Sequence, residues 1–447
     1  MSPVAESREI VSALRGGLVP RRGLSHFATG LEKLAKAVSE ELDFVATGKG
    51  ASKWIRGEYG SGKTFAARYL CAEARAKGFA TSEVQISIND TPLHQLETVY
   101  RRLVERLETD ADGPNAFQAI VDGWLYQLGE EVRRVKGLSE DDPAFADATE
   151  ERLADKLADL SRRNRAFAAA LRGYHRALHA SDFATAQGLL AWLAGQPHTD
   201  RSVLTGTGVS GKIDGQDALA FLSGVLLLLR QSGYRGLVVV LDEVETIQRM
   251  NSQIRMKALI ELRHLMDMLA NEELPGLYLI VTGTRDFFEG YKGLKQEAAL
   301  YGRVHVKFDD DARWDNLRAA QVRLLPFDED RLFRVGQSVR DLYPTEQTSR
   351  IQAKVSDPFL RSLVAQVTTG FGGKVAVAPR LFLRELTDVL DRVDQHQDFD
   401  PATHYRLKID EGELSPEELA AARGEPVPAP PDEPDEPAPP TPRRLDG

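Results

Sequence analysis

Short apolar stretches alternate with amphipathic helical patterns along most of this chain. The stretches are rich in apolar or β-branched residues, are bounded by Gly, Asp or Pro, and lie at 53–55, 83–88, 236–241, 276–282 and 304–308. Runs of this kind are typical of strands buried in a parallel sheet. Because helical segments separate them, the pattern predicts an α/β fold with a parallel sheet.

Long segments without strand patterns divide the rest of the chain. We expect a helical lead-in at 1–50, an α/β core at 51–312 that contains a long helical insert at about 91–231, and a helical domain at 313–400. Residues 401–447 are predicted to form a linker and a disordered tail. The tail is rich in Pro and acidic residues and has almost no large apolar side chains, so it cannot bury a core.

The negative charge of the chain is concentrated near its end. The formal net charge is −10 at pH 7. From Asp400 onward there are 12 acidic and five basic residues, so residues 1–399 carry only −3. An acidic average therefore does not exclude a local nucleic-acid surface.

Cysteine content and hydrophobicity bear on the compartment. The single cysteine, Cys71, excludes a disulfide framework and a thiolate metal cluster, and it suits a reducing cytoplasm. The first residues show no signal-peptide pattern, and the longest apolar run, at 218–229, is too short to span a bilayer. We therefore expect a cytoplasmic protein without a membrane partner.

The sequence GEYGSGKT at 57–64 follows the first predicted strand and precedes a helical pattern. It matches G-x-x-x-x-G-K-[ST], in which glycines let backbone N–H groups surround the β-phosphate of a nucleotide. The lysine of this motif reaches the β/γ oxygens, and its hydroxyl holds Mg²⁺. We therefore expect ATP and Mg²⁺ as cofactors. The residues expected to line the nucleotide here are Gly57, Glu58, Tyr59, Gly60, Ser61, Gly62, Lys63, Thr64 and Phe65.

A second stretch, GTGVSGKI at 206–213, has nearly the same spacing. Ile213 stands where the metal-binding hydroxyl would be, and no strand pattern precedes the stretch. We therefore interpret it as a flexible linker that closes the helical insert.

The predicted strand at 236–241 runs into two acidic residues, Asp242 and Glu243. An aspartate at a strand end can hold the Mg²⁺ shell together with the Thr64 hydroxyl. Glu243, one residue further, can polarise a water in line with the γ-phosphate, which favours hydrolysis over binding alone. We expect Glu245 to form a salt bridge or a cap rather than to act in catalysis.

Three further residues are candidates for the nucleotide site. Thr282 could hydrogen-bond the attacking water if its strand lies between the two nucleotide-binding strands; Thr284 is the competing residue, and turn capping is the alternative role. Arg303 ends a helical pattern and could act as an arginine finger on a neighbouring subunit, with Arg285 as the reserve and helix-dipole pairing as the alternative. Arg380 lies in the first turn of a helix, where the dipole disfavours a cation, so a nearby nucleotide explains it better.

These elements, in this order, resemble the AAA+ class of ATPases, close to the initiator and origin-recognition branch. More narrowly, GEYGSGKT, GYRGLVVVLDEVE, VTGTRDFF and VAPRLFLREL are similar to the ATP-binding protein family of BREX phage-defence systems, and the length fits its stand-alone BrxD members best. The resemblance covers roughly residues 20–395. It implies an additional-strand P-loop sheet with a C-terminal helical lid, a Mg²⁺-dependent ATPase, and an Lhr-like DNA helicase as partner.

Two segments are candidates for a DNA surface. Residues 161–180 contain no acidic residue, and on a helix their basic side chains fall within about 100° of one another. Such a stripe could follow phosphates, although the acid-rich helix before it could pair with it instead. The stripe consists of Arg162, Arg165, Arg172, Arg176 and His179. The loop at 287–295 is the second candidate.

We therefore expect an ATPase that works as a homo-oligomer on or beside DNA, with a helicase partner, in phage defence. Two alternatives remain open. One is a nucleotide switch similar to the STAND ATPases, with slow turnover and the insert as sensor. The other is a scaffold that loads a helicase and uses ATP only to set its shape.

Overall fold

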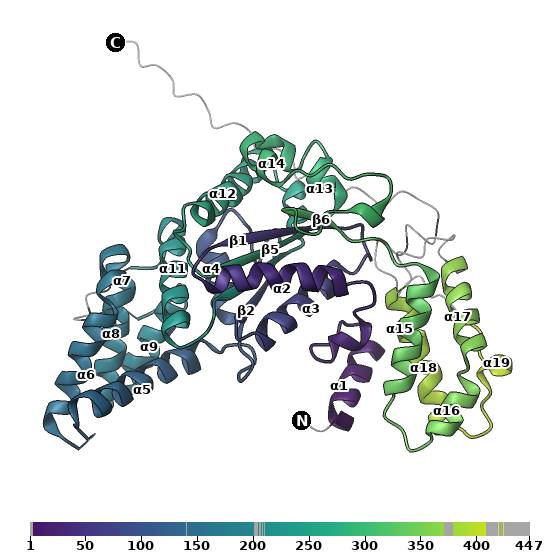
Figure 1. Cartoon of the computed structure of the whole chain (residues 1–447), viewed down its shortest axis with the longest axis horizontal. Coiled ribbons are helices and arrows are strands. Elements are labelled where there is room, and N and C mark those ends of the chain that lie inside the picture. The colour runs from purple at the N-terminus through teal and green to yellow at the C-terminus, as the bar shows by residue number, and fades with distance from the viewer. Residues whose placement is uncertain are drawn as a thin grey trace, which may run out of the picture.

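The computed structural model describes residues 3–139, 141–200, 204, 207, 209, 211–370, 379–407, 419 and 423. A twisted sheet lies at the centre (Figure 1). The helices of residues 117–193 extend away from it on one side, and the helices of residues 329–395 lie on the other. Most of the predicted disordered tail lies outside the described residues.

The central sheet has six strands in the order β3-β2-β4-β5-β1-β6. All neighbours are parallel except β2 and β3, which are antiparallel. Because β5 pairs with both β1 and β4, it separates these two strands. The strands are β1 (Ala51–Arg56), β2 (Ala80–Gln85), β3 (Leu107–Glu108), β4 (Leu237–Asp242), β5 (Leu277–Gly283) and β6 (Gln321–Arg323).

Four of the five predicted strands are present. The prediction of a strand at 304–308 is wrong, because these residues form no strand. Val304 instead ends helix α14 (Ala298–Val304), and β6 takes the place beside β1. The misleading run VHVKF has only one buried residue, Val304, and its Phe308 ring lies against the guanidinium groups of Arg56 at the end of β1 and Arg323 at the end of β6. The sheet thus extends beyond residue 312, and the short strand β3 lies within the segment predicted to be wholly helical.

One face of the sheet is covered by α2 (Glu32–Ala46) and α3 (Lys63–Ala76). Val238 and Val240 of β4 pack toward these helices, whereas Leu237, Val239 and Leu241 belong to the core on the opposite face. This alternation follows from the two-residue period of a strand. Both faces of the central strands are therefore apolar.

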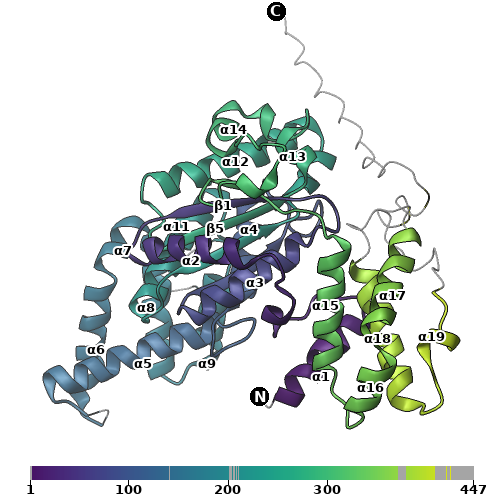
Figure 2. The same ribbon diagram turned by 45° about the vertical axis from the view of Figure 1, so that its right-hand side comes forward.

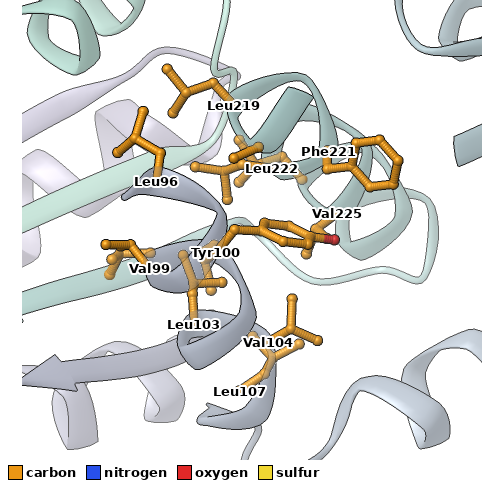
Figure 3. Packing of buried hydrophobic residues seen from close by; sticks show 14 of the residues in the cluster. Leu96, Val99, Tyr100, Leu103, Val104, Leu107, Leu219, Phe221, Leu222 and Val225 are labelled. Carbon is orange, nitrogen blue, oxygen red and sulfur yellow. The ribbon is translucent and has the colours of Figure 1, made fainter. Parts of the chain in front are cut away.

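The opposite face is covered by α4 (Leu96–Glu105), α11 (Gly215–Gln231) and α12 (Ser252–Ala270). Figure 3 shows the side chains of α4 and α11 packed against each other, with the Tyr100 ring among them. The Tyr100 hydroxyl donates to the backbone oxygen of Leu193 at 2.7 Å. The two helices that begin and end the predicted insert therefore belong to the core around the sheet.

The helices described between α4 and α11 form the part that extends away from the sheet (Figure 1). They are α5 (Phe117–Lys136), α6 (Pro143–Lys156), α7 (Ala158–Arg163), α8 (Arg165–His179) and α9 (Phe183–Leu193). Asp142, Asn164 and Asp182 accept hydrogen bonds from backbone N–H groups at the starts of α6, α8 and α9. Such caps satisfy donors that a helix cannot satisfy internally. Across the described residues, no helix is both long and apolar enough to cross a membrane.

The C-terminal helices form a separate core together with the first helix of the chain. They are α15 (Glu329–Leu342), α16 (Thr348–Lys354), α17 (Asp357–Gly370), α18 (Pro379–Gln395) and α19 (Pro401–His404). Helix α1 (Pro3–Arg15) packs along α18 (Figure 2). Its residues Ile10 and Leu14 belong to the apolar core of the C-terminal helices. Arg15 also pairs with Asp391 at 2.7 Å. The predicted lead-in is therefore divided: α1 packs with these C-terminal helices, which keep the name lid without any function implied, and α2 packs on the sheet.

Candidate nucleotide-binding site

The loop at 57–62 connects β1 to the N-terminus of α3. Gly60 and Gly62 have φ angles of 75° and 86°, which side chains with a Cβ rarely adopt. A Cβ at Gly57 would lie 2.2 Å from Ser61 Oγ. The glycines of the motif are thus required by the shape of the loop, and the loop brings backbone N–H groups to the positive end of α3.

Lys63 is the first residue of α3, and its side chain is only 8% exposed. Its Nζ donates to the backbone oxygens of Gly57 at 3.1 Å and Glu58 at 3.3 Å, and it lies 3.6 Å from Glu245 Oε1. The predicted salt bridge of Glu245 is therefore confirmed. Burial raises the pKa of the Glu245 carboxyl, and the Lys63 ammonium opposes this rise. Glu245 Oε2 and Ser61 Oγ are buried without a hydrogen-bond partner among the described residues.

Asp242 is the centre of a hydrogen-bonded group at the carboxyl ends of β4 and β5. Its Oδ2 accepts from the Thr64 hydroxyl at 2.7 Å, and its Oδ1 accepts from the Thr282 hydroxyl. The backbone N–H of Glu243 in turn donates to Thr282 Oγ1 at 3.2 Å. Asp242 and Thr282 are both buried. The position of β5 between β1 and β4 thus brings Thr282 directly to the acidic pair.

Glu243 has a left-handed backbone, with φ 58° and ψ 40°. Residues other than glycine adopt this conformation infrequently, and it is found disproportionately at functional sites. Its Oε2 accepts from Gln85 Nε2 at 2.9 Å. Gln85 ends β2, and the sequence analysis did not select it. A polar residue at the end of a buried strand is the signal that could have identified it.

A cavity of about 360 Å³ lies beside the loop, between the α/β core and the lid. Lys63, Thr64, Glu243 and Glu245 form part of its lining. Apolar residues from before α2 and from the lid also line it, among them Leu18, Val19, Pro20, Phe327, Leu332 and Leu383. Because these apolar residues carry no motif, sequence reasoning missed them. A cavity with both charged and apolar walls suits a ligand with a charged part and an apolar part.

Arg380 lines the same cavity from the first turn of α18. A Cβ at Gly17 would lie 3.1 Å from its Nε, so the segment after α1 passes close to this side chain. Residues 371–378, which precede it in the motif used to select it, lie outside the described residues. The structure therefore places Arg380 where it can face an anion in the cavity.

A family model for the BREX system ATP-binding protein BrxC/D matches residues 3–409. This range spans the sheet, the helical insert and the lid. The chain belongs to this family. The predicted resemblance to the BREX ATP-binding proteins is thereby confirmed, and the family assigns an ATP-binding role in phage defence. Comparison with curated proteins and with solved structures gives no match.

The site of this BREX-family protein fits the phosphates of ATP. The glycine loop leaves room for close approach of phosphate to the backbone, and among the described residues the buried Lys63 forms an ion pair with one carboxylate, that of Glu245. The hydroxyl of Thr64 and the carboxylate of Asp242 are oxygen donors 2.7 Å apart. Mg²⁺ prefers such oxygen ligands, so this pair could hold it.

The competing candidates Thr284 and Arg285 have structural contacts of their own. The Thr284 side chain accepts from the Phe287 N–H at the start of α13 (Arg285–Glu289). Arg285 pairs with Glu289 at 2.9 Å. Thr282 is therefore the threonine that touches the acidic pair.

Arg303 lies in the last turn of α14, half-exposed, and pairs with Asp267 of α12. It is absent from the described lining of the cavity. Within one chain it thus has a surface position, and a role toward a neighbouring subunit stays a prediction.

Three candidate segments from the sequence remain, two in the insert and one, the loop at 287–295, after β5. Arg176 pairs with Glu150 of α6, so pairing with the acid-rich helix is confirmed for this member of the basic stripe. The second phosphate-loop-like stretch lies partly outside the described residues, and its Ile213 is buried. Tyr291 of the loop at 287–295 is 86% exposed.

Proposed function

We propose that this ATP-binding protein is a Mg²⁺-dependent ATPase of the AAA+ type. The observation that carries the proposal is the group formed by Asp242, Thr282 and Glu243 at the carboxyl edge of the sheet. Glu243 lines the same cavity as Lys63 and Thr64. A protein that only bound ATP would need the loop but not an acidic pair held by a threonine of an inserted strand.

Each residue has a distinct part in the proposed reaction. When bound, ATP supplies the phosphoryl group to be transferred, and Mg²⁺ neutralises its charge. Lys63 and the loop N–H groups bind the phosphates, while Thr64 and Asp242 hold the metal. Glu243 accepts the proton of the attacking water at its carboxylate. Thr282 fixes the Asp242 carboxylate and the Glu243 backbone, so that both stay in place.

The most direct experiment is an ATPase assay of the purified full chain with and without Mg²⁺. The expected result is Mg²⁺-dependent phosphate release that is lost in Glu243→Gln and retained in Glu346→Gln, an exposed lid glutamate outside the site. ATP binding, measured with a fluorescent ATP analogue, should persist in both variants. Equal turnover in Glu243→Gln and wild type would refute the assignment.

We further propose that the protein works as a homo-oligomer on or beside DNA, with an Lhr-like helicase as partner. The half-exposed Arg303 supports the oligomer, because an arginine outside its own cavity can serve a neighbouring nucleotide. The exposed Arg165 of α8 supports a DNA surface, and the net charge of −3 over residues 1–399 does not exclude one. The helicase rests on the family resemblance. The tests are mass measurement with ATP and DNA stimulation of ATP hydrolysis.

A nucleotide switch is the second candidate function. The lining of the cavity includes Leu14 at the end of α1 and Leu332 and Leu383 of the lid, so an occupied cavity would touch all three elements. Nucleotide state could then set the lid position without rapid turnover. This reading predicts tight ATP binding with slow hydrolysis that DNA does not stimulate, whereas the ATPase reading predicts rapid hydrolysis that DNA stimulates.

A further inference from the structure

A second, smaller cavity lies on the outer side of α3, near the β2–β3 edge of the sheet. Its volume is about 70 Å³, against about 360 Å³ for the nucleotide cavity. It is lined by both signs of charge, with arginines in excess. The charged lining residues are Arg21, Arg68, Arg75, Arg106, Glu83 and Glu108.

Helix α3 and strand β2 contribute five of the residues that line this cavity. Arg68, Cys71 and Arg75 are three and four residues apart on α3, so they lie on one face of the helix. Thr81 and Glu83 are two residues apart on β2, so their side chains point to the same face of the sheet. Two sides of the cavity therefore come from regular, well-packed structure.

Two of the four arginines already have carboxylate partners. Arg68 donates to both oxygens of Glu83, with the shortest contact at 2.7 Å. Arg75 donates to the Thr81 hydroxyl at 2.7 Å and lies 3.3 Å from Glu108. Both glutamates of the cavity are thus used.

The other two arginines, Arg21 and Arg106, are exposed at the rim. Within the described part of the chain, neither side chain makes a hydrogen bond or an ion pair. Burial raises the pKa of the Cys71 thiol to about 12, so this residue adds no charge at neutral pH. Four arginines against two glutamates leave the cavity with two uncompensated positive charges.

We propose that this cavity binds a small phosphate oxyanion, either inorganic phosphate or the phosphate group of a small metabolite. A phosphate monoester carries nearly two negative charges at pH 7, which matches the excess charge of the cavity. Planar guanidinium groups bind phosphate oxygens with paired hydrogen bonds. The small volume excludes a whole nucleotide.

The phosphate cavity is distinct from the nucleotide cavity but adjacent to it. Val19 lines the nucleotide cavity and Arg21, two residues later, lines the phosphate cavity. Arg68 donates to the backbone oxygen of Val19 at 3.4 Å. Arg68 also lies one helical turn after Thr64 on α3. The proposal does not depend on ATP hydrolysis, because it concerns a separate set of side chains.

The test measures thermal unfolding of the full chain with increasing inorganic phosphate at constant ionic strength. All variants carry Lys63→Ala, so that phosphate in the nucleotide loop does not contribute. A ligand that binds only the folded state raises the unfolding midpoint as its concentration exceeds Kd. We expect this rise in Lys63→Ala and its loss when Arg21→Ala and Arg106→Ala are added. These two arginines have no described partners, so their removal should leave the fold intact.

The matched control adds Arg134→Ala and Arg165→Ala instead, which removes two exposed arginines of the insert and the same charge. This control should keep the rise. Loss of the rise in the control as well, or an equal rise with chloride, would show a general charge effect and overturn the proposal. Loss of the rise in Lys63→Ala alone would place phosphate in the nucleotide loop and also overturn it. A parallel titration with glycerol phosphate separates the sources: a response to it assigns the site to a phosphate ester, and its absence assigns the site to free phosphate.

Discussion

At the carboxyl edge of the sheet, charged and polar side chains are buried next to one another, whereas in the helical insert charged side chains lie on the surface. The edge has two buried pairs: an ammonium with a carboxylate 3.6 Å away, and a hydroxyl that donates to a second carboxylate. Buried charge is costly in free energy unless it is paired. These residues are Lys63, Asp242, Glu245 and Thr282.

The buried polar residues of the insert have local structural roles instead. Thr149 donates to the backbone oxygen of Phe145, and Asn164 caps α8. His175 contacts His179 one turn later on the same helix. These contacts lie within one helix or at its start, and none of these residues lines the nucleotide cavity. Buried polar groups therefore mark function only where they come from different elements and face a cavity.

Both regions contain buried polar atoms without a described hydrogen-bond partner, and they differ in what these atoms adjoin. In the insert, Asn164 Nδ2 and His175 Nδ1 are of this kind, and neither residue lines the nucleotide cavity. At the edge, Lys63 is 3.6 Å from the Glu245 carboxylate, and the second oxygen of that carboxylate has no described partner. Because Lys63 and Glu245 line the nucleotide cavity, a bound ligand can contact them there.

The largest expected effect tests whether the chemistry of the edge extends to a second subunit. Arg303→Ala should bind ATP normally but hydrolyse it more slowly, by on the order of 10³–10⁵ if the arginine acts as a finger. Its ion pair with Asp267 is half-exposed, so its loss should cost at most about 1 kcal/mol of stability. Rates and thermal unfolding of the same preparation check both statements.

Mixing Arg303→Ala with Lys63→Ala should restore part of the activity. An intact loop on one subunit would then meet an intact arginine on its neighbour. Asp267→Asn is the control, because it breaks the same pair and leaves the arginine in place. If a verified mixed oligomer shows no recovery, the finger is excluded and the single-chain switch is favoured.

The next effect tests the edge within one chain. Glu243→Gln should lower turnover by about 10²–10⁴, the usual contribution of a positioned proton acceptor. The amide oxygen can still accept from Gln85, so the local structure and ATP binding should persist. Single-turnover measurements separate this loss from slow product release. A variant that retains the native rate would remove Glu243 from the catalytic group.

The sequence predicted the edge better than any other region. Motif spacing identifies Lys63 and Thr64, because phosphate and metal binding require these residue types at fixed positions in the loop, and the end of an apolar strand identifies Asp242. The place of β5, and hence the contact of Thr282 with Asp242, depends on strand order, which a local pattern does not contain. From the sequence alone, the contact of Thr282 with Asp242 is therefore predictable only on condition that β5 lies between β1 and β4.

Other regions could not be predicted because their structure depends on distant partners. The run at 304–308 has an alternating pattern, but the place beside β1 is taken by β6, a strand too short to stand out. Gln85 and the two cavities depend on residues that meet only after folding. The lid contact of α1 is of the same kind, since Ile10 and Leu14 pack on helices more than 300 residues away.

A smaller effect is expected from removing the hydroxyl that holds the acidic pair. Thr282→Val should lower the free energy of unfolding by about 1–3 kcal/mol, because it leaves Asp242 Oδ1 and the Glu243 N–H without their buried partner. Turnover should fall with it. Thr282→Ser keeps the hydroxyl and should retain most of both. Denaturant unfolding and ATPase rates distinguish the two variants, and a stable, active Thr282→Val would contradict the role.

The smallest effect belongs to the insert and completes the comparison. Arg176 and Glu150 form an exposed pair between α8 and α6, and a double-mutant cycle with alanine should give a coupling energy of about 0.2–1 kcal/mol. The Arg176 guanidinium holds the pKa of the Glu150 carboxyl below its usual value. Because the folded-state pKa is the lower one, the coupling should be present at neutral pH and vanish as the pH falls below about 4.5 and the carboxyl is protonated.

High salt should reduce the Arg176–Glu150 coupling at neutral pH, since both side chains reach solvent. ATP hydrolysis without DNA should be unchanged in Arg176→Ala, in Glu150→Ala and in the double variant, because neither residue lies in the nucleotide cavity. A change in that basal rate would show that the insert is coupled to the edge, and the contrast between the two regions would then fail. A lower rate only in the presence of DNA, confined to Arg176→Ala, would instead identify the basic stripe of α8 as the DNA surface.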